Sequence, residues 1–369
     1  MTAPSNSSAS GARAYTPARW PKRVRMLRVP AIGLSLRVDV VSLALTVVLL
    51  LVTAAVGVWS LGVSTTDAPS LGFFQTLQVL TGQISGRPAN LVAAALPAVV
   101  VAILGGVSLA LSGAIFQTVT RNPLGSPDII GFTTGANTGA LVAMLMLNLG
   151  TAGATIGSLI GCLLTALVVY FLGMRGGTGN YRFIIVGIGV SAMLVSLNGY
   201  LIANANQQNA GAAAAWGMGS LRNVTMSETI PVLITLAVLI PALIVVAPRM
   251  RMFELGTDSA QSKGVDTGRT QLILLIVGVG FAAATTAIAG PIAFVALVAP
   301  QLAARITPSA GIPLVTSAAV GATLLVSSDA IARTILTPTT QLPVGVVTTS
   351  LGGLYLLFLL VAQSRKARV

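Results

Sequence analysis

The side chains that most often carry proton transfer or metal binding are scarce in this sequence of 369 residues. Histidine is absent, and the eight carboxylates all sit at or near the ends of apolar runs, at Asp39, Asp67, Asp128, Glu228, Glu254, Asp258, Asp266 and Asp329. A carrier driven by protons or sodium ions normally buries an acid or a histidine mid-membrane, at a cost of roughly 2.5–3.5 kcal/mol or more. The pattern therefore disfavours such a carrier. Without clustered acids or a histidine base, a membrane-embedded enzyme is also disfavoured.

Neither a disulfide framework nor a nucleotide-binding loop is encoded. The single cysteine, Cys162, lies inside an apolar run, and we interpret it as a small buried hydrophobic residue. The Gly-x-x-x-x-Gly-Lys-Ser/Thr loop that cradles ATP phosphates is absent. If ATP drives this protein, another subunit must hydrolyse it. We expect no cofactor and no metal to be bound by this chain.

Two polar segments interrupt the apolar sequence in ways that suggest contact with a partner. Residues 249–270 form the one long polar loop, in which apolar Leu255 and Ala260 alternate with polar residues, as in a small helix seated in a groove; Gly264 would end that helix. An ordinary solvated loop is the alternative. In residues 121–128, two prolines break helix continuity, and a simple capped turn is the alternative there.

The elements that hold these segments are predicted to be membrane-spanning helices. The chain is 54% hydrophobic and 8% charged, whereas a soluble domain carries about 25% charged residues. Continuously apolar runs exclude the alternating strands of a membrane barrel. A helix needs about 20 apolar residues to cross. Splitting the runs at Gly, Pro and Asn predicts an all-α integral membrane fold with about ten spans, at 40–62, 90–116, 131–149, 153–173, 183–203, 229–248, 270–289, 291–304, 310–332 and 342–362.

The distribution of basic residues predicts the orientation. With both termini in the cytoplasm, 18 of the 21 basic residues fall inside, and only Arg87, Arg222 and Arg333 fall outside. The high isoelectric point then reflects topology and contact with anionic lipid head groups, not nucleic acid. Residues 1–38 are rich in Ser, Pro and Arg, and we expect a disordered, basic cytoplasmic tail there, followed by a ten-helix domain over residues 39–369.

Four ordered groups of motifs resemble those of FecCD-type permeases, the ten-span subunits of iron-siderophore, haem and cobalamin ABC importers. The resemblance covers about residues 40–362, and it implies the architecture of a type II ABC importer permease. The matching segments are 111–117 with 121–131, then 216–221, then 255–264, and finally 290–305 with Asp329-x-x-x-Arg333 and 342–346. Gly290-Pro291 also supplies a bend that could make a span discontinuous, as is common near transport paths.

The resemblance implies a role for each motif. The cytoplasmic turn and the 249–270 loop would face the ATPase through Arg121, Asn122, Pro123, Leu255, Gly256, Asp258, Ala260 and Gly264. Arginines on the outer face would pair with carboxylates of a substrate-binding protein; Arg333 matches the family position, and Arg87 and Arg222 lie on the same side. Exposed pairs of this kind set orientation and encounter rate more than affinity.

Departures from the family pattern bear on the partner subunit. Where the family usually has Arg-x-Pro-Arg, this chain has Ala95-Leu96-Pro97-Ala98, and Lys263 replaces a usual leucine. A different second permease could carry the missing docking charges, which favours a heterodimer over a homodimer. The implied assembly therefore contains this chain, a second permease, a cytoplasmic ATPase dimer and a substrate-binding protein at a bacterial cytoplasmic (inner) membrane.

The motifs resemble those of siderophore permeases more than those of cobalamin permeases. The resemblance therefore favours a ferric siderophore as cargo, and haem or cobalamin is the alternative. Bare iron would need histidine or a cluster of Cys, Asp and Glu ligands, whereas chelated iron needs only a wide, weakly interacting path. Gly187, Ser191 and Asn198 on the 183–203 span are candidates to line that path. Such residues more often allow close helix packing, so both interpretations stay open.

Overall fold

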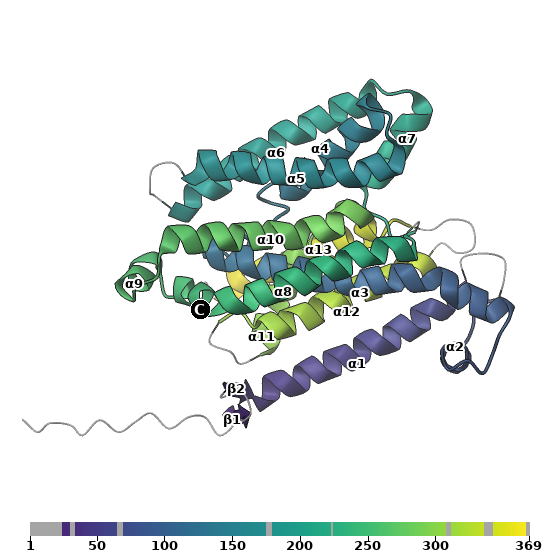
Figure 1. Ribbon diagram of the computed structural model, residues 1–369, viewed down its shortest axis with the longest axis horizontal. Helices are drawn as coiled ribbons and strands as arrows, with labels where there is room; N and C mark the ends of the chain where they lie inside the picture. Colours follow the sequence, from purple (N-terminus) through teal and green to yellow (C-terminus); the bar gives the residue numbers. More distant parts are fainter. Residues whose placement is uncertain are drawn as a thin grey trace, which may run out of the picture.

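The computed structural model describes residues 24–29, 34–64, 69–174, 179–222, 224–307, 311–335 and 342–366 (Figure 1). Almost all of them are helical. The helices are α1 (Val40–Gly62), α2 (Phe73–Leu80), α3 (Arg87–Thr120), α4 (Phe132–Leu141), α5 (Gly150–Met174), α6 (Gly179–Ala203), α7 (Gln207–Gly217), α8 (Met226–Glu254), α9 (Thr257–Ser262), α10 (Thr267–Ala289), α11 (Val295–Ile306), α12 (Leu314–Thr334) and α13 (Val344–Lys366).

Each predicted span coincides with helix, but the helices are not equally long. Among the described residues, seven are long and apolar enough to cross a membrane: α1, α3, α5, α6, α8, α10 and α12. The other three predicted spans fall on α4, α11 and α13. The α4 segment changes after ten residues to a π-helix, η2 (Val142–Met146), in which the Leu147 N–H donates to the Val142 carbonyl oxygen at 3.1 Å. Extra turns of this type often occur at functional sites.

Helices α3 and α10 form the centre of the molecule. Figure 1 shows them between α1 on one side and the layer of α4, α5, α6 and α7 on the other. Serine side chains tie the two helices together: the Ser108 hydroxyl donates to the Phe281 carbonyl at 2.7 Å, and the Ser112 hydroxyl donates to the Gly278 carbonyl at 2.6 Å. Small residues such as serine let two helix backbones approach closely. Close packing matters here because lipid supplies no hydrophobic driving force for helix association.

Glycines bring α4 and α5 into direct backbone contact. Gly135 and Gly139 on α4 face Gly157 and Gly161 on α5, and a Cβ atom added to any of the four would collide with backbone or side-chain atoms across the contact. Each helix therefore presents a Gly-x-x-x-Gly pair to the other, which is the pattern of closely packed membrane helices.

The amino-terminal region differs from its prediction. Residues 1–23 lie outside the described part, but β1 (Val24–Val29) pairs antiparallel with β2 (Leu34–Asp39), so the expected disorder does not extend over these strands. The sequence from Leu34 to Asp39 alternates apolar and polar residues, a period typical of strands. Asp39 then caps α1, because its Oδ1 accepts hydrogen bonds from the backbone N–H groups of Val41 and Ser42.

Candidate functional site

The three arginines that the charge pattern puts outside line one cavity of about 1120 Å³, named here the outer cavity. Arg87 is the first residue of α3, Arg222 lies after α7, and Arg333 lies in the last turn of α12. The sequence predicted a common side of the membrane for these residues but not a common cavity. The residues just after α1 and the first residue of α13 complete the wall of the outer cavity.

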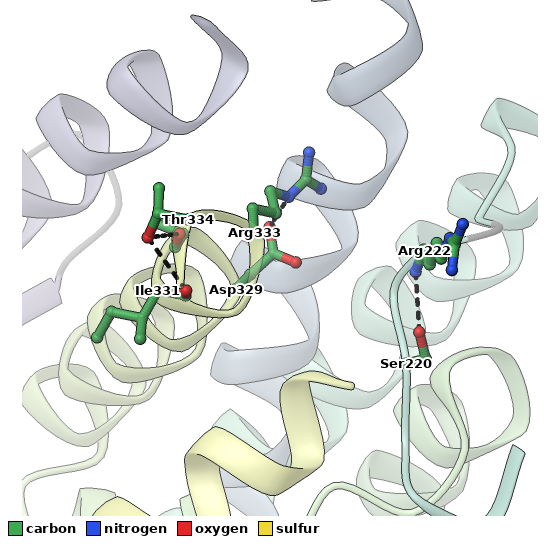
Figure 2. Close-up of polar contacts among 7 residues, drawn as sticks. Ser220, Arg222, Asp329, Ile331, Arg333 and Thr334 are labelled. Carbon is green, nitrogen blue, oxygen red and sulfur yellow. Dashed lines mark hydrogen bonds and ion pairs between the residues drawn. The ribbon is translucent and has the colours of Figure 1, made fainter. Parts of the chain in front are cut away.

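Tight turns position two of the arginines. Gly86 has a φ of 83° immediately before Arg87, and Gly219 has a φ of 71° shortly before Arg222. Residues with a side chain rarely adopt this left-handed backbone conformation, whereas glycine adopts it without steric cost. The backbone N–H of Arg222 donates a hydrogen bond to the Ser220 hydroxyl at 3.2 Å (Figure 2). This bond holds the segment after α7 in place.

Arg333 is largely buried and ion-paired in this chain. Its Nε donates to the Asp329 carboxylate at 2.8 Å, and the two residues are only 9% and 4% exposed (Figure 2). They are one helical turn apart on α12, the spacing at which opposite charges meet. Removing one partner of a buried pair leaves the other charge uncompensated, which costs roughly 3–5 kcal/mol.

Charge in the outer cavity is unbalanced. Among the described lining residues, three guanidinium groups face a single carboxylate, that of Asp329. Within the described part of the chain, no ion pair involves Arg87 or Arg222, and both residues are exposed. Asp67 lies between the lining residues Ser64 and Pro69 in the sequence, but outside the described residues. The described walls therefore present a net positive charge.

At the opposite end of the helices, α8, α9 and α10 form the predicted coupling segment. Gly256 and Gly264 have φ values of 104° and 80°, so glycine is needed on each side of α9. Leu255 is 60% exposed and Asp258 is also exposed, as a contact surface requires. Ala260 is wrongly predicted as part of that surface, because it is fully buried and packs towards the protein body.

The turn of residues 121–128 lies next to this segment. A Cβ atom on Gly256 would lie 3.7 Å from an Nη atom of Arg121, which caps the end of α3. The Asn122 side chain accepts a hydrogen bond from the Leu124 N–H at 2.9 Å, and the Pro123 carbonyl accepts one from the Gln301 side chain on α11. A second cavity, of about 650 Å³, is lined by these turn residues and by α11 and α13.

Asp128 connects the turn to the break between α10 and α11. Its Oδ2 accepts a hydrogen bond from the Phe294 N–H at 3.2 Å. Phe294 caps α11 with a left-handed φ of 69°, and Gly290 has a φ of 72°. Desolvation raises the pKa of the Asp128 carboxyl from about 3.8 to about 6, and hydrogen bonds from Thr133 and Phe294 oppose the increase.

Of the three candidate path residues on α6, Ser191 faces α4, and Gly187 faces the segment just before α4. The hydroxyls of Ser191 and Thr134 are 3.0 Å apart, a Cβ on Gly187 would collide with Ile130, and Asn198 is 6% exposed. Gly187 and Ser191 therefore pack against neighbouring segments of this chain, whereas the buried Oδ1 of Asn198 has no hydrogen-bond partner among the described residues. Gly189 and Gly199 are the glycines of α6 with open space around them.

Comparisons with known proteins agree with the arrangement. Residues 39–362 match the FecCD transport family. The chain is 42% identical over 324 residues to the ferric enterobactin transport system permease protein FepG of Escherichia coli (strain K12), covering 86% of this chain and 96% of that protein. It is 33% identical over 327 residues to the achromobactin transport system permease protein CbrC of Dickeya dadantii (strain 3937), covering 88% and 91%.

A solved structure shares the fold. It is described as a metal-chelate type ABC transporter in an inward-facing conformation, and it superposes with a TM-score of 0.72 at 23% identity. The similarity covers 86% of this chain and 99% of that chain. The helical arrangement is therefore shared with that transporter.

Proposed function

This chain belongs to the FecCD transport family, and on that premise we propose that it is the membrane-spanning permease subunit of an ATP-driven importer of ferric siderophores. The observation that carries the proposal is its similarity to a ferric enterobactin permease along nearly the whole of that protein. The chain is a multi-pass protein of the bacterial inner membrane.

We propose ten spans with both termini in the cytoplasm. Helices α4 and α11 would each supply part of a span, α4 together with η2 and α11 after the Gly290-Pro291 break. The excess of basic residues on the cytoplasmic side supports this topology. Residues 1–38 would remain in the cytoplasm as a basic tail near anionic lipid, and residues 39–369 would form the permease domain.

The coupling segment would receive the movement of a separate ATPase dimer. Exposed Leu255 and Asp258, the strained turn at Gly256, and neighbouring Arg121 form one surface at the ends of α3, α8 and α10. Asn122, Pro123 and Gly264 complete its edges. An apolar side chain among polar ones is the pattern of a short helix that inserts into a groove.

At the outer end, a substrate-binding protein would dock over the outer cavity. Arg87 and Arg222 are exposed and can reach carboxylates of that protein, with Arg333 beneath them held by Asp329. Because Ala95 and Ala98 stand where the family usually has arginines, a second, different permease subunit would supply the remaining docking charges. We therefore favour a heterodimer.

Co-purification tests the assembly. A tagged chain expressed in its own host at native level should bring down an ATPase and a second permease of different sequence. Uptake in a strain lacking the gene should fall for a ferric siderophore and stay unchanged for cobalamin and haem. Loss of cobalamin or haem uptake alone would refute the substrate, and purification without any ATPase would refute the mechanism.

A further inference from the structure

The outer cavity is large for a small-molecule site. Its volume of about 1120 Å³ lies just above the range of roughly 300–1,000 Å³ for ligand pockets. Its wall is mostly uncharged, with apolar residues such as Leu91, Leu221 and Val344 and polar groups such as Asn90 and Ser220.

The charged groups in that wall are almost all of one sign. Asp329 is paired with Arg333, so this pair adds little net field at a distance. The charges of Arg87 and Arg222 remain uncompensated by any described lining residue. Cavities lined by one sign of charge with low-dielectric walls concentrate ligands of the opposite sign.

We propose that the outer cavity selects a multiply anionic ferric chelate over a neutral one, with Arg87 and Arg222 as the selecting residues. This inference rests on the proposed function and specifies the chemical class of its cargo. Three catecholate groups around Fe³⁺ give a triply negative complex, whereas three hydroxamate groups give a neutral one. The positive wall attracts only the first.

The same arginines are candidates for docking the binding protein, so a test must separate cargo from partner. The complex of this chain with its second permease and ATPase should be placed in nanodiscs of zwitterionic lipid, without binding protein. Equilibrium binding is then measured for two hexadentate probes, a ferric tris-catecholate and a ferric tris-hydroxamate. Arg87→Gln and Arg222→Gln are compared with Arg249→Gln, which removes an exposed charge at the cytoplasmic end of α8.

The tris-catecholate should bind about ten-fold more tightly than the tris-hydroxamate, a difference of about 1.4 kcal/mol. The double variant R87Q/R222Q should lose most of this preference, and R249Q should keep it. High salt should reduce the preference, because exposed charges are screened. Asn90→Lys, which adds a charge one turn after Arg87, should strengthen binding of the tris-catecholate and guards against a loss caused by misfolding.

Equal binding of the two probes, or an equal effect of R87Q/R222Q and R249Q, would overturn the inference. ATP-driven uptake by the complete importer separates this failure from a failure of the proposed function. If some ferric chelate is still imported with ATP, only the assignment of the cavity is wrong. If no ferric chelate is imported, the proposed function is wrong as well.

Discussion

The carboxylate of Asp128 accepts a hydrogen bond from the backbone N–H of Phe294, although 166 residues separate the two. Asp128 belongs to the turn of residues 121–128 that contains Arg121, and Phe294 caps the short helix α11 after the break at Gly290. The Gln301 side chain on α11 also donates to the Pro123 carbonyl of the turn, and Gln117 at the end of α3 donates to the Leu297 carbonyl at 2.9 Å. The turn and α11 should therefore move together.

Asp128→Ala should reduce transport while ATP hydrolysis stays nearly unchanged. Without the acceptor, α11 loses the bond that fixes its first residue to the turn, and movement of the turn is transmitted less completely. We expect uptake by reconstituted complexes to fall about ten-fold, equivalent to about 1.4 kcal/mol, with ATPase activity within about two-fold of wild type. Asp128→Asn keeps an acceptor oxygen and is the matched control. Wild-type uptake by the alanine variant would contradict this role.

The same carboxyl predicts how stability depends on pH. Its folded pKa of about 6 is above its unfolded value, so the folded state favours the protonated form. This contribution to stability is fully present below about pH 4 and is lost as pH rises through 6. The difference of about 2 between the folded and unfolded pKa values corresponds to at most about 3 kcal/mol of stability. Thermal unfolding in detergent between pH 4.5 and 7.5 should show wild type losing stability relative to Asp128→Asn as pH rises, and parallel curves would exclude this.

Gly256 should tolerate no other residue. Its φ of 104° with a ψ of 150° lies in a region that is essentially restricted to glycine. Gly256→Pro and Asp258→Arg should abolish uptake while membrane insertion stays normal, because both alter the surface offered to the ATPase. Gly268→Ala, in the first turn of α10, is the control, because its Cβ would meet only the Asp266 carboxylate, at an ordinary contact distance of 3.7 Å. Uptake and protein level are measured together, and normal transport by either variant would remove the role assigned to this segment.

Contact between α4 and α5 should be sensitive to single methyl groups. Gly139→Ala would push a Cβ into the Gly157 carbonyl, and such overpacking typically costs about 1–3 kcal/mol. Gly199→Ala on α6 adds the same group where nothing lies within 4 Å. Thermal unfolding of the purified variants should therefore show a lower midpoint for Gly139→Ala only. Equal midpoints would mean that the helices separate at little cost.

Hydropathy predicted the helices well because long apolar runs in lipid have few alternatives to helix. Residues 40–62 were predicted with the bounds of α1. The π-helical end of α4 and the outer helices α2 and α7 were missed, since a change of hydrogen-bond pattern and short amphipathic helices leave little periodicity to read. The β1–β2 hairpin was missed because its alternation occurs within a segment judged mainly on its charge.

For the site residues, the sequence predicted the side of the membrane better than it predicted which residues contact one another. The charge pattern put Arg87, Arg222 and Arg333 on the outer side, and a shared cavity follows only from how α3 and α12 pack. The pairing of Arg333 with Asp329 was available from their four-residue spacing, but its burial was not. Ala260 was assigned to the wrong face because a six-residue helix is too short to show which face is covered.

Cysteine labelling can test the proposed topology. Cys162 is the single cysteine and is buried, so a Cys162→Ala background allows one reporter at a time. Arg222→Cys should react with a membrane-impermeant maleimide applied from outside, and Lys263→Cys should react only in inverted vesicles. Both residues are exposed, so accessibility within the protein does not limit the reaction. Labelling of both from the same side would exclude the proposed orientation.

The most direct measurement is transport by purified components in sealed vesicles. This chain is reconstituted with its second permease and binding protein, and accumulation of a ferric siderophore is followed with the ATPase and ATP present or omitted. We predict accumulation only when the ATPase and hydrolysable ATP are both present. Accumulation of the siderophore without the ATPase would contradict the conclusion that the chain is a permease driven by a separate subunit.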